Sequence, residues 1–188
     1  MQVKRGWTVL KISKWGALLG CWALVTPGTA LAVTQGSLGS TSTGSVSITA
    51  TVPGRVQIGG LTDIAFGTVD PSSAASQSED VCVWSNMSGR GYQVTATGSG
   101  ASNAFSLSDG TNTLPYSVEW AGSIGQSSGT ALTSGSALTG LTSTATSPTC
   151  SSGASKTASF FVKMDATSLQ AAVASSYTGT LTLVVAPQ

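Results

Sequence analysis

The chain has 188 residues, no histidine, 8% charged residues and a formal net charge of +1. Without histidine, the Ser-His-Asp and Cys-His mechanisms of nucleophilic catalysis are excluded. Four of the eight Lys and Arg residues lie within the first 14 positions, so the rest of the chain has four basic against seven acidic residues. Its net charge of −3 offers no basic face to phosphates, and we expect no nucleic-acid partner.

A basic and then apolar leader opens the chain. Its four basic residues precede an apolar run at residues 15–25, which is followed by Pro-Gly at 27–28 and Ala-Leu-Ala at 30–32. This order predicts a secretory signal peptide over residues 1–32 and therefore export. The apolar run is shorter than the roughly 20 residues that a membrane-spanning helix needs, and we expect no such helix. The alternative is a lipoprotein signal acylated at Cys21.

Two cysteines, Cys82 and Cys150, follow the leader. An even pair in an exported protein predicts a disulfide, and two free buried thiols are the alternative. Two cysteines without histidine do not make the usual four-ligand zinc site, so we expect neither a metal nor another cofactor.

The residues after the leader are rich in Ser, Thr and Gly and predict short strands joined by turns. We expect strands at residues 46–52, 55–58, 64–66, 81–85, 92–97, 105–107, 114–120, 158–164 and 177–187. This spacing predicts an all-β fold, an antiparallel β-sandwich in one domain. The last strand would leave its edge uncovered, and a strand-like segment would follow a flexible leader at residues 33–43.

The connections are predicted from turn residues and composition. Hairpins should join 81–85 to 92–97, and 105–107 to 114–120, the second through Asp109-Gly110. Three further segments have weaker patterns: residues 69–78 are expected to be a loop, residues 121–155 one or two weak strands within long loops, and residues 168–174 a helical turn.

Residues 44–52 alternate small polar residues with the apolar residues Val46, Ile48, Ala50 and Val52. Two interpretations are open. A type II turn at Pro53-Gly54 would fold the segment onto residues 55–61 as a local hairpin. Alternatively, the segment is a strand that adds to the sheet edge of a neighbouring molecule.

The sequence gives only weak indications of catalytic or sugar-binding groups. Residues 125–129 match the G-x-S-x-G nucleophile motif, but they lie in a Ser/Gly-rich stretch without a base and are interpreted as a loop. Four carboxylates could include a glycosidase pair, although solvated surface charges are expected; they are Asp63, Asp70, Glu79 and Asp80. Four aromatic residues could form a sugar platform, although their strand positions favour the core; they are Trp84, Tyr92, Tyr116 and Trp120.

Four stretches together resemble the spore-coat-U-like domain of archaic chaperone–usher pilus subunits. They are TGSVSITATVPGRVQIGGLTDIAFGTVD, VCVWSN with GYQVTATG, LPYSVEW, and SYTGTLTLVVAPQ, and the likeness covers nearly all of residues 40–187. The resemblance implies an immunoglobulin-like sandwich that lacks its last strand. A periplasmic chaperone would fill the gap first. The N-terminal strand of the next subunit would replace it during secretion through an outer-membrane usher.

The resemblance also assigns residues. The donor strand would be residues 44–52, with the anchors Val46, Ile48, Ala50 and Val52. The acceptor groove would be lined by Leu181, Leu183 and Val185. The domains would be the signal peptide (1–32), the leader with the donor strand (33–54) and the pilin-like sandwich (55–188).

One position departs from the family pattern. Such subunits often have a cysteine in the first domain strand, paired with the one at Cys82, and here Val56 stands in its place. The resemblance then implies that Cys82 pairs with Cys150. The implied function is a non-enzymatic subunit of a surface fimbria that supports adhesion or biofilm formation. The alternative is a monomeric secreted carbohydrate- or surface-binding module.

Overall fold

The structure is a computed structural model that describes residues 33–153 and 155–188. The predicted signal peptide, Cys21 included, lies outside the described residues. The chain divides into two units with the boundary after Thr51. The unit from Val52 onwards is all-β, with antiparallel strands and little helix.

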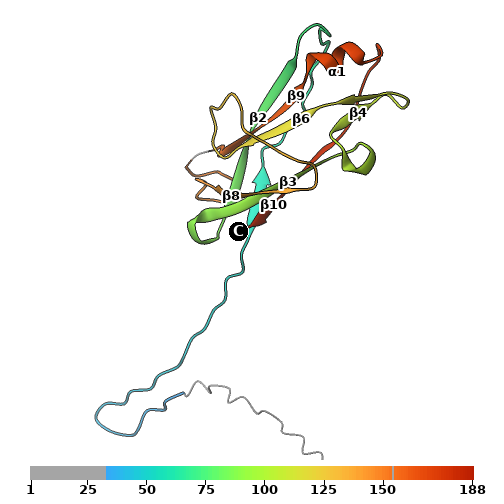
Figure 1. The fold of residues 1–188 in the computed structure, drawn as a ribbon. Coiled ribbons are helices and arrows are strands. Elements are labelled where there is room, and N and C mark those ends of the chain that lie inside the picture. Colours follow the sequence, from blue (N-terminus) through green and yellow to red (C-terminus); the bar gives the residue numbers. More distant parts are fainter. Residues whose placement is uncertain (1–32, 154) are drawn as a thin grey trace, which may run out of the picture. The chain divides into compact units, whose positions relative to one another are not determined.

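The described residues of the second unit form ten strands and one α-helix in chain order. They are β1 (Val56–Gly59), β2 (Ala75–Ser85), β3 (Gly91–Gly98), β4 (Ser106–Ser108), β5 (Thr113–Pro115), β6 (Ser117–Ala121), β7 (Thr130–Ala131), β8 (Ala137–Thr142), β9 (Ala158–Met164), α1 (Ala166–Ala171) and β10 (Leu181–Pro187). They form a five-stranded sheet β1-β2-β9-β6-β7, a three-stranded sheet β10-β3-β8 and the pair β4-β5. In Figure 1, β2, β9 and β6 lie in one layer and β3, β8 and β10 in another.

Both large sheets contribute to one core. Its buried side chains are Val81, Val83, Tyr92, Val94, Ala96, Leu114, Tyr116, Val118, Trp120, Leu132, Ala158, Phe160, Val162, Met164 and Leu169. Trp120 donates its ring N–H to the Tyr92 hydroxyl at 3.2 Å, and the two rings meet edge to face. Burial raises the pKa of Tyr92. Such an aromatic pair adds about 0.5–1.5 kcal/mol to the stabilisation from area burial alone.

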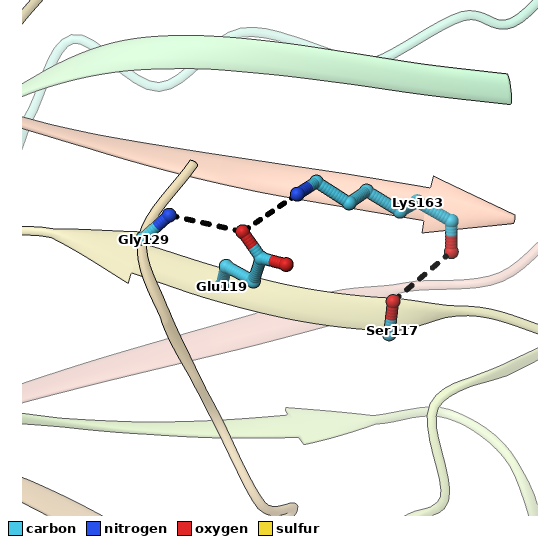
Figure 2. Close-up of polar contacts among 4 residues, drawn as sticks. All are labelled: Ser117, Glu119, Gly129 and Lys163. Carbon is cyan, nitrogen blue, oxygen red and sulfur yellow. Dashed lines mark hydrogen bonds and ion pairs between the residues drawn. The ribbon is translucent and has the colours of Figure 1, made fainter. Parts of the chain in front are cut away.

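Strand β9 is apolar on both faces because it lies between β2 and β6 at the centre of the larger sheet. Its sequence ASFFVKM is buried at every position except Lys163. Lys163 lies over the Phe161 ring and pairs with Glu119 of β6 at 2.7 Å. Figure 2 shows that the same Glu119 oxygen also accepts the backbone N–H of Gly129. The Lys163 and Gly129 hydrogen bonds lower the pKa of Glu119 and fasten the loop after β6 to the sheet.

The predicted hairpin between 81–85 and 92–97 is wrong. Strand β2 pairs with β1 and β9, whereas β3 pairs with β10 and β8, so the chain crosses from one sheet to the other. The crossing uses a 3₁₀ turn at Ser88–Arg90, in which Gly89 and Arg90 have φ of 65° and 56°. The local sequence of a strand does not indicate which sheet the strand joins, so it did not distinguish a crossing from a hairpin.

Two further predictions of strand boundaries are wrong. Residues 75–78, expected in a loop, belong to β2 and pair with β9 from Met164 to Phe161. Their side chains are largely exposed, which permits a polar, loop-like composition in a paired strand. Residues 64–66 are not a strand, because no described strand pairs with them, although Ile64 and Phe66 pack against the core.

The second hairpin is confirmed in part. Strands β4 and β5 pair antiparallel, and Gly110 has the positive φ of 97° that the turn requires. The Asp109 carboxylate accepts the backbone N–H groups of Thr111 and Asn112 at 2.9 and 2.6 Å. Hydrogen bonds, those from Asn112 first, hold the pKa of Asp109 well below its usual range. The predicted single arm 114–120 is two strands, since β5 stops before Tyr116 and β6 joins the larger sheet.

The predicted elements within residues 121–155, 168–174 and 177–187 are present, but they begin or end at other residues than expected. The stretch 121–155 contains two short strands, β7 and β8, within loops. Helix α1 begins two residues before the predicted turn because Asp165 caps it, accepting the N–H of Ser168 at 2.7 Å. That bond lowers the pKa of Asp165. Strand β10 begins only at Leu181, because Thr178 pairs instead with Ser108 of β4. In the described ranges, no helix has the length and hydropathy of a membrane span.

The predicted disulfide is confirmed: Cys82 of β2 is bonded to Cys150, with 6.0 Å between their Cα atoms. Both cysteines are buried, at 4% and 5% exposure, in a small cluster with Ala145 against which Trp84 packs. The bond joins the β8–β9 connection to β2. It closes a loop of 68 residues, long enough to restrict the unfolded chain substantially.

The first unit contains the leader and most of the alternating segment. Two backbone hydrogen bonds join Thr34 and Ser45, at 3.0 and 2.9 Å, and close residues 35–44 into a loop. Residues 46–55 belong to no strand. The local-hairpin interpretation is wrong, because the β1 ladder is formed with β2 and not with residues 44–52. No turn or bend is present at Pro53-Gly54, so the type II turn of that interpretation is absent.

Candidate docking groove

One edge of β10 has no partner among the described strands. Strand β10 pairs with β3 along its whole length, from Leu181–Gly98 to Pro187–Tyr92, and it is the outer member of the sheet β10-β3-β8. An edge strand presents unpaired backbone N–H and C=O groups that can bind a further strand. The β10 edge is therefore a possible docking site for an extended polypeptide.

A rim without regular structure, residues 61–66, lies across from β10. It is held by side chains of other elements: the Glu79 carboxylate of β2 accepts the backbone N–H and the hydroxyl of Thr62, the latter at 2.7 Å. Nearby, Lys156 donates to the Gly60 carbonyl at 2.9 Å. These side-chain bonds substitute for a strand ladder and fix the rim at a distance from β10.

Between the two rims lies a hollow of about 560 Å³, which we name the β10 groove. Its lining comprises the 61–66 rim, β10, the segment before it and the inward face of β9: Leu61, Thr62, Asp63, Ile64, Phe66, Leu107, Tyr116, Phe160, Val162, Met164, Gly179, Thr180, Leu181 and Leu183. Phe160, Val162 and Met164 are members of the core itself. Core side chains of β9 therefore form the floor of this groove.

A second hollow, of about 750 Å³, continues the β10 groove. The two share Ile64, Phe66, Leu107, Met164 and Gly179 in their linings. The second hollow extends past the end of β10 toward α1 and residues 172–178. The two hollows are therefore continuous, and their combined lining reaches from β10 and residues 61–66 to α1 and residues 172–178.

Most side chains in the lining of the β10 groove are apolar, although polar atoms make up nearly half of its surface. Asp63 is the only charged residue in its lining, and it is exposed. Tyr116 is the most buried polar residue there, with 8% of its surface exposed, and burial raises the pKa of its hydroxyl. An occupant should therefore be largely apolar on the side that faces β9.

The residues predicted for the acceptor groove lie on one face of β10. Leu181, Leu183 and Val185 are half-buried, while Thr182 and Val184 between them are exposed. Leu181 and Leu183 line the β10 groove; Val185 packs against the core but is not part of the lining. Sequence reasoning missed the 61–66 rim as a groove wall and the inward face of β9 as its floor. The apolar alternation of Ile64 and Phe66 was the available signal for the rim.

The residues predicted for the donor strand are exposed. Val46, Ile48 and Val52 have 69%, 87% and 81% of their surfaces exposed, and Ala50 is exposed as well. Exposed apolar side chains close together in a segment are a feature of interaction sites, which makes residues 46–52 a candidate for binding an apolar surface. The alternation repeats every two residues, as the side chains of an inserted strand do.

The other candidate groups have structural roles. Residues 125–129 lie in the loop between β6 and β7, without the strand–turn–helix setting of a nucleophile. Three of the four carboxylates accept hydrogen bonds from nearby groups. Asp70 accepts the backbone N–H of Ser72, Glu79 the hydroxyl of Thr62, and Asp80 the hydroxyl of Ser159. Within residues 33–153 and 155–188, no three metal-binding side chains gather at one place.

Three of the four aromatic candidates belong to the core: Tyr92, Tyr116 and Trp120 are 0%, 8% and 1% exposed. Trp84 is half-buried beside the disulfide. The core-filling interpretation is confirmed for the three. In comparisons with known proteins, no protein-family model and no curated protein matches the sequence.

Proposed function

We propose that this protein is a structural subunit of a surface pilus, assembled by donor-strand exchange through the chaperone–usher pathway and supporting adhesion or biofilm formation. The observation that carries the proposal is the β10 groove, whose floor consists of core side chains of β9 and which lies beside a strand edge that has no partner among the described strands. In this reading the fold is an immunoglobulin-like sandwich without its final strand. The two sheets on one core support that reading.

The chain also contains a segment of suitable chemistry to fill the groove. If residues 46–52 were inserted as a strand, their alternation would place four apolar side chains on one face of it. At roughly 1.5–2 kcal/mol each, burying them would contribute about 6–8 kcal/mol. Ordering about nine residues opposes this by roughly 1–2 kcal/mol each. Backbone hydrogen bonds to the edge of β10 reduce that opposition, so the strand edge and the apolar floor are both needed.

The proposal implies partners before and after assembly. An open core binds other apolar surfaces, so a periplasmic chaperone should occupy the β10 groove until an outer-membrane usher delivers the next subunit. The predicted signal peptide and the disulfide support passage through an oxidising periplasm to the cell surface. No enzymatic activity is proposed. The alternative, a monomeric carbohydrate-binding module, has less support, because three of its four candidate aromatic residues are buried.

The experiment is a test of chain assembly. The full chain, exported to a periplasm and processed after residue 32, should give a ladder of multiples on SDS gels when the sample is not heated, and a single monomer band after boiling. Inserted strands exchange backbone hydrogen bonds and bury apolar anchors, so they should dissociate slowly. A stable monomer in unheated samples at every concentration, obtained without any chaperone, would refute the proposal.

A further inference from the structure

Asn86 holds the point at which the exposed segment 46–52 joins the rest of the chain. Its backbone N–H donates to the carbonyl of Arg55 at 3.1 Å, which extends the β1–β2 ladder by one residue pair. Its side-chain oxygen accepts the backbone N–H of Arg55, and its side-chain amide donates to the carbonyl of Pro53 at 2.9 Å. Three hydrogen bonds from one residue therefore fix the backbone on both sides of Gly54.

Gly54 itself is closely packed. A Cβ atom placed there would lie 2.8 Å from the sulfur of Met87 and 3.8 Å from Cβ of Pro187, at the end of β10. Gly54 is not among the glycines with a positive φ, and neither it nor Pro53 lies in a turn or bend. The backbone of residues 53–55 is therefore held beside Pro187 in a conformation that does not reverse the chain.

The bonds of Asn86 use the groups that a reversal of the chain would need. A type II turn over residues 52–55 requires a positive φ at Gly54 and is closed by a hydrogen bond from the Arg55 N–H to the carbonyl of residue 52. In the structure, that N–H donates to Asn86 instead. Asn86 also holds the Pro53 carbonyl, whose peptide group would have to rotate before Gly54 could reach a positive φ. Asn86 therefore competes with the turn for the same backbone groups.

The turn would bring the segment to the groove of its own chain. Reversal at Pro53-Gly54 pairs residue 52 with residue 55 and, continued along β1, places Val46 opposite Leu61. Strand β1 is an outer strand of the five-stranded sheet, so its second edge has no partner among the described strands. Leu61 and Thr62 belong to the lining of the β10 groove. A segment folded back in this way would therefore reach the rim of that groove.

The covalent connection favours such self-occupation. A segment joined to its own domain by a short link has an effective concentration on the order of millimolar near that domain. A second copy of the chain at a lower concentration would lose this competition if the turn formed freely. Assembly therefore needs a feature that disfavours the turn, and the hydrogen bonds of Asn86 have the required geometry.

We propose that Asn86 is a positioning residue that keeps residues 46–52 available to a second copy of this chain. It does so by withholding the Arg55 N–H and the Pro53 carbonyl from the turn that would fold the segment back. This inference rests on the proposed function and deepens it, since it names the residue that decides between self-occupation and assembly.

The test compares monomers of the processed chain with those of Asn86→Ala, Asn86→Asp and Ser88→Ala. Asn86→Ala lacks both side-chain hydrogen bonds, whereas Asn86→Asp keeps an acceptor for the Arg55 N–H. Ser88→Ala is the control, an exposed position two residues further along. Each chain is refolded below the concentration at which unheated gels show multiples. Hydrogen exchange with mass spectrometry then reports the amides of residues 46–52, and the amides of β9 serve as the reference for an intact core.

We expect the exchange of residues 46–52 to slow about tenfold in Asn86→Ala, because the loss of two hydrogen bonds shifts the equilibrium toward the folded-back segment by about that factor. The concentration at which half of the chains are in multiples should rise by the same factor. Asn86→Asp and Ser88→Ala should stay within about threefold of the unaltered chain, because the Arg55 N–H keeps its acceptor. A simple loss of stability would instead speed the exchange of both regions.

Asn86→Gln is the second test variant, because its amide lies one carbon further from the backbone and is displaced from the Arg55 N–H. It should show the same slowing as Asn86→Ala, and it decides the question if β9 exchanges faster in Asn86→Ala.

The outcomes separate the inference from the proposed function. If the unaltered chain forms multiples but residues 46–52 exchange equally fast in all monomers, the inference is overturned and the proposed function stands. Equal slowing in Asn86→Ala and Asn86→Asp also overturns it, because the retained acceptor then has no effect. If the unaltered chain forms no multiples at any concentration, the proposed function fails, and the inference fails with it.

Discussion

Ile48→Asp should abolish assembly of the chain into multiples. Ile48 is the largest of the four exposed anchors, and insertion would bury its side chain against the apolar floor of β9. Compared with isoleucine, aspartate forgoes about 2 kcal/mol of stabilisation from the burial of apolar surface. Burying its carboxylate without a hydrogen-bond partner costs at least a similar amount. Together these correspond to about a thousandfold loss in the affinity of the segment for the groove.

The matched control is Thr49→Asp, the same change one residue further along. Its side chain alternates to the opposite face of the strand and would remain in solvent after insertion. The unheated ladder should therefore persist in Thr49→Asp and disappear in Ile48→Asp. Equal ladders in the two variants would show that the alternation of residues 46–52 has no part in assembly.

Removing the disulfide between Cys82 and Cys150 should cause the largest decrease in the free energy of unfolding. In the double variant Cys82→Ala with Cys150→Ala, the unfolded chain regains the freedom of a 68-residue loop. The chain-entropy relation gives a loss of about 4 kcal/mol in the free energy of unfolding. This loss is measured most simply by urea unfolding of chains that also carry Ile48→Asp, because these chains should not form polymers that would change the apparent stability. Chemical reduction of the otherwise unchanged chain should give a similar loss, and a difference below about 1 kcal/mol would contradict the expectation.

Much of the fold follows from local patterns in the sequence. The run ASFFVKM identifies β9 because a strand buried on both faces has no polar alternation. The Asp109-Gly110 turn identifies the β4–β5 hairpin. The pairing of β2 and β3 with different sheets was not predictable in this way, because the pairing of strands depends on tertiary packing, which the local sequence does not report. Residues 75–78 were missed because a ladder needs only backbone groups, which composition does not report.

The candidate site was predictable to a smaller extent. The alternation of Leu181, Leu183 and Val185 marks one face of β10, and that of residues 46–52 marks an exposed apolar row. The walls and floor of the β10 groove come from elements far apart in the chain, so no local pattern indicates it. Phe160 and Val162 have the same sequence signature in a closed core as in a groove floor. The sequence could not indicate that the Tyr116 hydroxyl is buried without a hydrogen-bond partner, because this depends on the residues that surround it in the fold.

The most direct measurement of the central claim is photo-crosslinking from the donor position. A photoreactive amino acid is placed at position 48, and polymers are grown from an equal mixture of isotope-labelled and unlabelled chains. After irradiation, mass spectrometry should find peptides of mixed isotope content that join position 48 to β10 or to residues 61–66. Adducts that join only chains of the same isotope content, or that lie outside the β10 groove, would contradict the claim that a second copy fills it.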